Sequence, residues 1–240
     1  MVGPSRSPGA TTVLTCGDPA RRRWSDALRA ALEAPGTADV ALVGVGATPT
    51  RAEVDPLLDG STRLVVAGDD AALAAVLVRL LRRERLDVAL ALLPAGESEA
   101  ATVWGLAAAT DVSTAVPVAL SAPAHAVPLV RDDRGGVVIG SHRLGAFHGE
   151  VYCDAERLVR GDAAGLVVRP DPERAGLAVT VTGPRRLGGL RPGPVRAARG
   201  RAVQVGCRPV TVVREGVGED RPIERRSWYR HVEDWHLVRP

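Results

Sequence analysis

An alternation of apolar runs and helix-like segments in the first half of the chain constrains the fold most. Residues 87–94 (DVALALLP) form a largely apolar run, and residues 63–68 (RLVVAG) form another that leads directly into a helix-like segment. Shorter strands are predicted at residues 11–15 and 39–45. Strands of a parallel sheet are buried on both faces and therefore read as continuous apolar runs. Residues 12–120 are predicted to form an α/β domain around a parallel sheet.

The segments between these runs carry helix signals. After Asp69 and Asp70, apolar residues recur at helical spacing and arginines crowd the end, which places opposite charges where the helix dipole favours them. An earlier helix is predicted with Asp18 as its N-cap and Pro19 in its first turn. A weak helical stretch precedes Gly60. A further helix is predicted after residue 94, with one face formed by Ala100, Val103, Trp104, Ala107 and Ala108.

The composition and the predicted secondary structure change near residue 120. Residues 114–120 (TAVPVAL) are predicted to add a fifth strand to the first domain, and glycine and proline then become dense. In residues 177–182 (LAVTVT) Leu177, Val179 and Val181 share one face, and the threonines point the other way. Residues 121–240 are therefore predicted to form a β-rich, sandwich-like domain of antiparallel strands. Residues 1–11 are predicted to be a disordered lead-in.

Composition excludes several kinds of site. All 31 basic residues are arginine, and the chain has no lysine and no asparagine. A Schiff-base lysine, a P-loop lysine and an asparagine ligand are therefore excluded. The three cysteines are scattered without C-x-x-C spacing, which indicates a reduced, cytoplasmic protein with buried thiols and no metal site. No apolar run reaches the ~18 residues of a membrane span.

The positive charge is unevenly placed. The net charge is only +3, yet nine arginines and no acidic residue lie between Arg174 and Arg214. Such a block favours partners that carry phosphate, either a nucleotide or a lipid or anionic membrane surface to which the protein would bind peripherally. A solvated set of loops is the alternative. A nucleic acid is not expected as a partner, and a homodimer is compatible with the pattern.

A serine hydrolase is one interpretation of the segment GESEA around Ser98. It approximates the G-x-S-x-G elbow, with a strand before it and a helix after it. Ser98 would be the nucleophile, and Asp220 with His231 or His236 would complete the triad in chain order. The predicted helices stop soon after this motif, however, and the last glycine of the motif is Ala100. The hydrolase therefore remains the less favoured alternative.

Two loops at the ends of neighbouring predicted strands carry the other interpretation. They are AGDDA at residues 67–71 and PAGESEA at residues 94–100. Both place small residues and a helix N-terminus at the carboxyl edge of the sheet, where α/β proteins bind ligands. Their spacing, and the order of an α/β half before a β-rich half, resemble the diacylglycerol kinase catalytic-domain family. That family includes sphingosine kinases and bacterial lipid kinases, is related to NAD kinases, and has G-G-D-G-T and P-x-G-T-x-N-D at these places.

The resemblance implies a fold, a reaction and a set of site residues. The reaction would transfer the γ-phosphoryl group of ATP to a lipid hydroxyl, with Mg²⁺ neutralising the phosphates. Glu215, in the segment REGV, stands where the family has the aspartate that serves as base, so Glu215 and Asp69 are the catalytic candidates. The candidate nucleotide-binding residues are Gly68, Asp69, Asp70, Gly96 and Ser98.

Two acidic residues in the second loop leave a further alternative open. Glu97 and Glu99 stand at family positions that are uncharged, and a carboxylate repels a phosphate. The chain could therefore be a catalytically inactive member of the family that acts as a binding or regulatory protein. The loops could also be ordinary strand-to-helix turns in which Asp69 is an N-cap.

Overall fold

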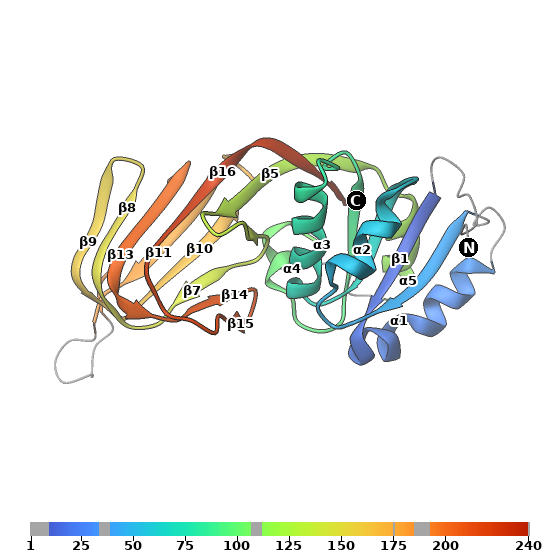
Figure 1. Ribbon diagram of the computed structural model, residues 1–240, viewed down its shortest axis with the longest axis horizontal. Helices are drawn as coiled ribbons and strands as arrows, with labels where there is room; N and C mark the ends of the chain where they lie inside the picture. Colours follow the sequence, from blue (N-terminus) through green and yellow to red (C-terminus); the bar gives the residue numbers. More distant parts are fainter. Residues whose placement is uncertain (1–9, 34–38, 107–111, 175, 185–192, 240) are drawn as a thin grey trace. The chain divides into compact units, whose positions relative to one another are not determined.

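The chain forms two compact units (Figure 1). The computed structural model describes residues 10–33, 39–106, 112–174, 176–184 and 193–239. The first unit comprises Met1–Val127 and Asp234–Pro240, and the second comprises Pro128–Glu233. The sequence-based division placed the last residues with the β-rich half, whereas in the structure they join the sheet of the first unit.

The first unit is built on a parallel sheet, as the apolar runs predicted. Its strand order is β2-β1-β3-β4-β16, and each neighbouring pair is parallel. Only the end of β16 belongs here, where His236 and Leu237 pair with β4. The strands are β1 (Ala10–Cys16), β2 (Val40–Val45), β3 (Ser61–Gly68), β4 (Ala89–Pro94) and β16 (Ile223–Val238).

Helices cover both faces of this sheet. The chain moves from β1 outward to β2 and then back across β1 to β3 and β4, so right-handed crossovers place the first helix on one face and the third on the other. In agreement, α1 packs against α5, and α2 packs against α3. The helices are α1 (Gly17–Leu32), α2 (Arg51–Leu58), α3 (Asp70–Arg82), α4 (Glu99–Val103) and α5 (Val112–Ser121). None of the described helices is long and apolar enough to cross a membrane.

Three local predictions in this unit were wrong. The expected fifth strand at residues 114–120 is part of helix α5, where Ala115, Val116 and Ala119 are buried at helical spacing. Helix α1 begins at Gly17 and its N-cap is Cys16, so Asp18 lies inside the first turn, where it pairs with Arg21.

Helix α4 is also shorter than predicted. It ends at Val103, with Trp104 as its C-cap and Gly105 at a φ of +70°. A left-handed residue of this kind commonly ends a helix, and glycine adopts it without strain. The predicted face positions Ala107 and Ala108 lie outside the described residues.

The second unit is a β-sandwich, as predicted. One layer has the order β16-β13-β8-β9, and the other has the order β12-β11-β10-β7-β14-β15. Strand β5 pairs with β6. The strands are β5 (Ala124–Asp132), β6 (Val137–Val138), β7 (His142–Leu144), β8 (Phe147–Cys153), β9 (Glu156–Ala163), β10 (Gly165–Asp171), β11 (Gly176–Thr182), β12 (Val195–Gly200), β13 (Ala202–Val210), β14 (Val212–Arg214) and β15 (Val217–Gly218).

Aliphatic side chains from both layers fill the sandwich, together with one tryptophan. Leu177, Val179 and Val181 of β11 are all buried, as their alternation predicted. They share a core with Val203 and Trp228 of the facing layer. The second unit thus has a core of its own.

Candidate functional site

The carboxyl edge of the parallel sheet holds both loops singled out from the sequence. The chain leaves β1 for one side of the sheet and β3 for the other, so the topological switch point lies between these two strands. Open α/β sheets bind ligands at this place. Helices α1 and α3 start directly after β1 and β3, and α4 starts after the short loop 95–98 that follows β4.

Gly68 ends β3 and is held tightly. A Cβ atom at this position would lie 2.9 Å from Ala72 Cβ and 3.0 Å from Cys16 Cβ. Its carbonyl accepts a hydrogen bond from Ala95 N at 2.8 Å, which joins the two loops. Trp24 of α1 supports the second loop from below, since its indole donates to the Pro94 carbonyl at 3.0 Å. Close packing therefore accounts for the glycine at position 68.

Asp69 is the N-cap of α3. Its Oδ1 accepts a hydrogen bond from Ala72 N at 2.8 Å, which satisfies one of the amides that a helix leaves unpaired at its start. Burial is the main reason why the pKa of the nearby Cys16 thiol rises to about 12, and Asp69 and Glu53 raise this pKa further.

Asp70 joins the two loops through its side chain. The residue is 8% exposed. Its Oδ1 accepts a hydrogen bond from Ser98 Oγ at 2.5 Å, and its Oδ2 accepts one from Ala100 N at 3.0 Å. Ser98 is in turn the N-cap of α4 and accepts from Ala101 N at 2.9 Å. The chain's own carboxylate therefore occupies the start of α4, where the family resemblance predicts a phosphate.

The second loop offers space but the wrong charge for a phosphate. A Cβ atom at Gly96 would meet nothing within 4 Å, and the backbone there does not have a positive φ. Glu97 is exposed and Glu99 is half-buried beside it. Asp69 matches the aspartate of the family's first motif, whereas Asp70, Glu97 and Glu99 add three carboxylates to the two loops. These three residues do not fit the triphosphate of ATP. No group of three or more metal-ligating side chains occurs in the described part of the chain.

Glu215, the candidate base, belongs to the second unit and is sequestered there. Its side chain is only 3% exposed. One oxygen accepts from Ile139 N at 2.9 Å, and the other accepts from Gly140 N at 3.0 Å and Ser141 N at 3.2 Å. Glu215 has a φ of +46° and Gly216 has one of +83°, so the pair forms the tight turn between β14 and β15. These contacts give Glu215 a structural role in the described unit.

Behind Glu215 lies a buried polar cluster that the sequence did not reveal. Trp228 Nε1 donates to His142 Nδ1 at 2.9 Å, so His142 carries its proton on Nε2, which lies 3.2 Å from the Val137 carbonyl. Burial lowers the pKa of His142 to about 3. Arg226 is fully buried, donates to Asp132 at 2.8 Å and pairs with Glu219 at 2.6 Å. Only the register of strands far apart in sequence brings these residues together.

Two residues of the hydrolase interpretation, Ser98 and His236, lie far apart within the first unit. The hydroxyl of Ser98 donates a hydrogen bond to Asp70 Oδ1. His236 pairs with Ala89 at the beginning of β4, and its Nδ1 lies 2.9 Å from the Leu86 carbonyl. Ser98 follows the other end of this strand, roughly 16 Å away at ~3.3 Å per residue. Asp220 and His231 belong to the second unit.

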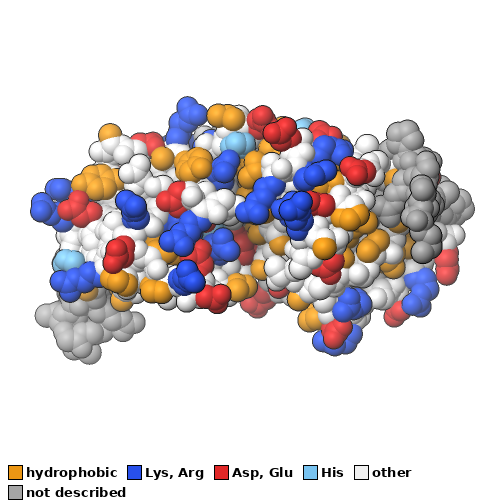
Figure 2. Space-filling view, in the orientation of Figure 1, with side chains coloured by type: hydrophobic (Ala, Val, Ile, Leu, Met, Phe, Trp, Pro, Cys, Tyr) orange, Lys and Arg blue, Asp and Glu red, His pale blue; other side chains and the backbone are white. Residues whose placement is uncertain are grey.

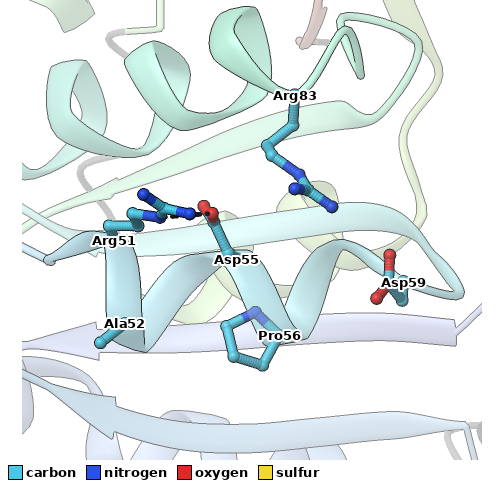
Figure 3. A pocket seen from close by; sticks show the side chains of 6 residues that line it. All are labelled: Arg51, Ala52, Asp55, Pro56, Asp59 and Arg83. Carbon is cyan, nitrogen blue, oxygen red and sulfur yellow. Dashed lines mark ion pairs between the residues drawn. The ribbon is translucent and has the colours of Figure 1, made fainter.

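An open hollow of about 460 Å³ lies beside α2 and the end of α3 (Figure 3). Asp55 is already engaged there, because it accepts two hydrogen bonds from Arg79 at 2.7 and 2.8 Å and lies 3.4 Å from Arg51. Helix α3 places this hollow about 20 Å from the loops at its other end. The mixed charges favour no single class of ligand. The lining residues are Arg51, Ala52, Asp55, Pro56, Asp59 and Arg83.

Comparison with known proteins identifies the fold. No protein-family model matches the sequence, and no curated protein does. A crystal structure of a diacylglycerol kinase from Bacillus anthracis str. Sterne is similar over 99% of this chain and 98% of its own, with a TM-score of 0.67 and 10% identity. An NAD kinase from Archaeoglobus fulgidus, solved in complex with ATP, is similar over 96% of this chain and 93% of its own, with a TM-score of 0.57 and 12% identity. The chain therefore has the kinase-like fold of these proteins, as the motifs predicted.

Proposed function

We propose that this protein is a catalytically inactive relative of the lipid kinases, which uses a kinase-like fold for binding and regulation. The observation that carries this proposal is the position of Asp70. Its carboxylate already accepts from Ser98 Oγ and Ala100 N, the donors at the start of α4. A phosphate would have to displace the bound carboxylate of Asp70 and approach those of Glu97 and Glu99, which the family's motifs lack, so nucleotide binding is strongly disfavoured.

A thermal-shift titration with ATP and Mg²⁺ tests the proposal. The wild-type melting temperature is expected to stay constant up to millimolar nucleotide, because a ligand that does not bind the folded state cannot stabilise it. A saturable rise would contradict the proposal.

A restored variant makes the test sharper. Asp70→Gly, Glu97→Thr and Glu99→Asn together remove three carboxylates from the loops, and nucleotide is expected to raise the melting temperature of this variant. Asp59→Gly, at the C-cap of α2, removes one carboxylate without touching the loops and serves as the control. If the restored variant stays unresponsive, the carboxylates are not the reason for the lack of binding.

Gly96 favours a second candidate, an active lipid kinase. Neither packing nor a positive φ explains this glycine, whereas close approach of a nucleotide would. The test is transfer of radiolabelled γ-phosphate from ATP to dispersed diacylglycerol. Transfer by the wild type that is lost in a Glu215→Gln variant with an unchanged melting temperature would favour the kinase. Absence of transfer from both proteins would favour the binding protein.

A further inference from the structure

Strand β2 forms one end of the parallel sheet of the first unit (Figure 1). It pairs in parallel with β1 over all six of its residues. The Asp39 carbonyl, just before the strand, accepts a hydrogen bond from Thr11 N at 3.2 Å. Because the backbone groups of alternate residues point to opposite sides of a strand, the odd-numbered residues of β2 face β1. The N–H and C=O groups of Val40, Leu42 and Gly44 therefore point away from β1, and none of the described strands pairs with them.

The other ends of the two described sheets are protected by charge or are very short. A strand edge with open backbone groups can pair with another strand, and proteins prevent this with charged side chains or with short edge strands. Strand β15 has only two residues. Strands β9 and β12 carry charged side chains, which are Glu156, Arg157, Arg160, Asp162, Arg196 and Arg199. Strand β2 has the sequence VALVGV, without a charged residue or a proline, so its own side chains do not prevent a further strand from pairing.

The side chains at this open edge are apolar. Leu42 is 44% exposed, and it is the one exposed large hydrophobic side chain among the described residues of the first unit. Gly44 shares its face of the strand, where Arg21 of α1 lies 3.6 Å from the position of a Cβ atom, so Leu42 points to the α1 side of the sheet. Arg21 is itself paired with Asp18 at 2.8 Å. Acidic and basic side chains intersperse on the face of the molecule drawn in Figure 2, whereas β2 offers only apolar groups and open backbone groups.

We propose that β2 pairs with β2 of a second copy of this chain, in antiparallel orientation across a twofold axis at Leu42. The outward residues fix the register: Leu42 is opposite Leu42 of the second copy, and Val40 is opposite Gly44 of the second copy. All six residues of the strand then take part, and the open N–H and C=O groups find partners. Asp39 is opposite Val45 of the second copy, and six residues at ~3.4 Å each place it about 20 Å from its own counterpart. No like charges therefore face each other along the strand.

An identical strand fits this edge better than a foreign peptide does. A peptide recognised by its charge needs charged side chains on the strand that it joins, and β2 has none. A twofold contact uses the same surface on both copies, so each group that finds a partner on one copy also finds one on the other. The two Leu42 side chains then lie together on the face of the joined sheet that α1 of each copy covers. This proposal does not depend on whether the loops of the first unit bind a nucleotide.

Analytical ultracentrifugation of the full chain over a range of concentrations tests the proposal. A dimer is expected for the wild type. Leu42→Arg and Leu42→Glu, each alone, are expected to raise the dimer Kd by about tenfold or more, because like charges then face each other across the axis. A mixture of the two variants is expected to form a heterodimer, since opposite charges then meet at the axis. This rescue also shows that both variants fold.

A matched control and a local measurement complete the test. Val195 is an exposed aliphatic residue on another edge strand, β12, so Val195→Arg is expected to leave the dimer Kd unchanged. In hydrogen exchange, the amides of Leu42 and Gly44 are expected to exchange slowly in the dimer and fast after dilution, whereas the amide of Val43, which faces β1, stays protected.

Four outcomes would overturn the proposal. They are a wild type that stays monomeric, a dimer that Leu42→Arg leaves intact, a mixture of the two charge variants that does not associate, and slow exchange of Leu42 and Gly44 in the monomer. The last outcome would show that another segment of the same chain covers the edge.

Discussion

Gly68 and Gly96, the two glycines of the candidate loops, differ in how closely their surroundings pack against them. In Gly68→Ala the new Cβ would lie 2.9 Å from Ala72 Cβ and 3.0 Å from Cys16 Cβ, and both of these atoms are fixed close to the backbone. We expect a loss of about 1–3 kcal/mol in the free energy of unfolding, as for other overpacked sites. In Gly96→Ala the new Cβ meets nothing within 4 Å, so we expect a change within about 0.5 kcal/mol. Denaturant unfolding of both variants measures the difference, and equal losses would contradict the packing explanation.

At the level of the element, agreement between local signals decided what could be predicted. Helix α3 was predictable because its apolar spacing, the acidic cap at Asp69 and the basic end all indicate a helix. Helix α5 was not, because Pro117 disfavours a helix interior and the β-branched residues of TAVPVAL favour a strand locally. The helical conformation is favoured because the apolar face of α5 is buried against α1, a contact that local sequence does not show.

In the candidate site too, local sequence signals predict contacts within one element but not contacts between elements. The N-cap role of Asp69 follows from local chemistry. The contacts of Asp70 with Ser98 and Ala100 span 28 and 30 residues. They arise because parallel pairing brings the ends of β3 and β4 together, and no local pattern encodes that geometry.

Arg226 ties several elements of the second unit together. It joins β16 to Asp132 at the end of β5 and to Glu219 just after β15. Arg226→Met removes the cation closest to the buried Asp132 and leaves only Arg214 at 3.9 Å, so we expect a loss of about 3–5 kcal/mol. Adding Asp132→Asn should restore part of that loss, because no unpaired charge then remains buried. Denaturant midpoints of the single and double variants measure this coupling, and a double variant no more stable than Arg226→Met would contradict it.

The dependence of the whole chain's stability on pH should come from two histidines, chiefly the buried His142 and also the partly buried His231, whose pKa is likewise lowered by burial. His142 has a folded pKa of about 3, whereas an unfolded histidine has one near ~6.5. Between these values the unfolded chain binds a proton that the folded second unit does not, so stability falls as the pH falls from about 6.5 toward 3. The expected slope reaches ~1.4 kcal/mol per pH unit.

His142→Gln isolates this contribution, because glutamine does not titrate. We expect the variant to lose less stability than the wild type between about pH 6.5 and 5, above the range in which most carboxylates bind protons. His148→Gln is the control: His148 is half-exposed and pairs with Asp162 on the surface, so its removal should leave the steep pH dependence in place. Urea unfolding at several pH values provides the slopes. Parallel slopes for the wild type and His142→Gln would show that another group causes the pH dependence.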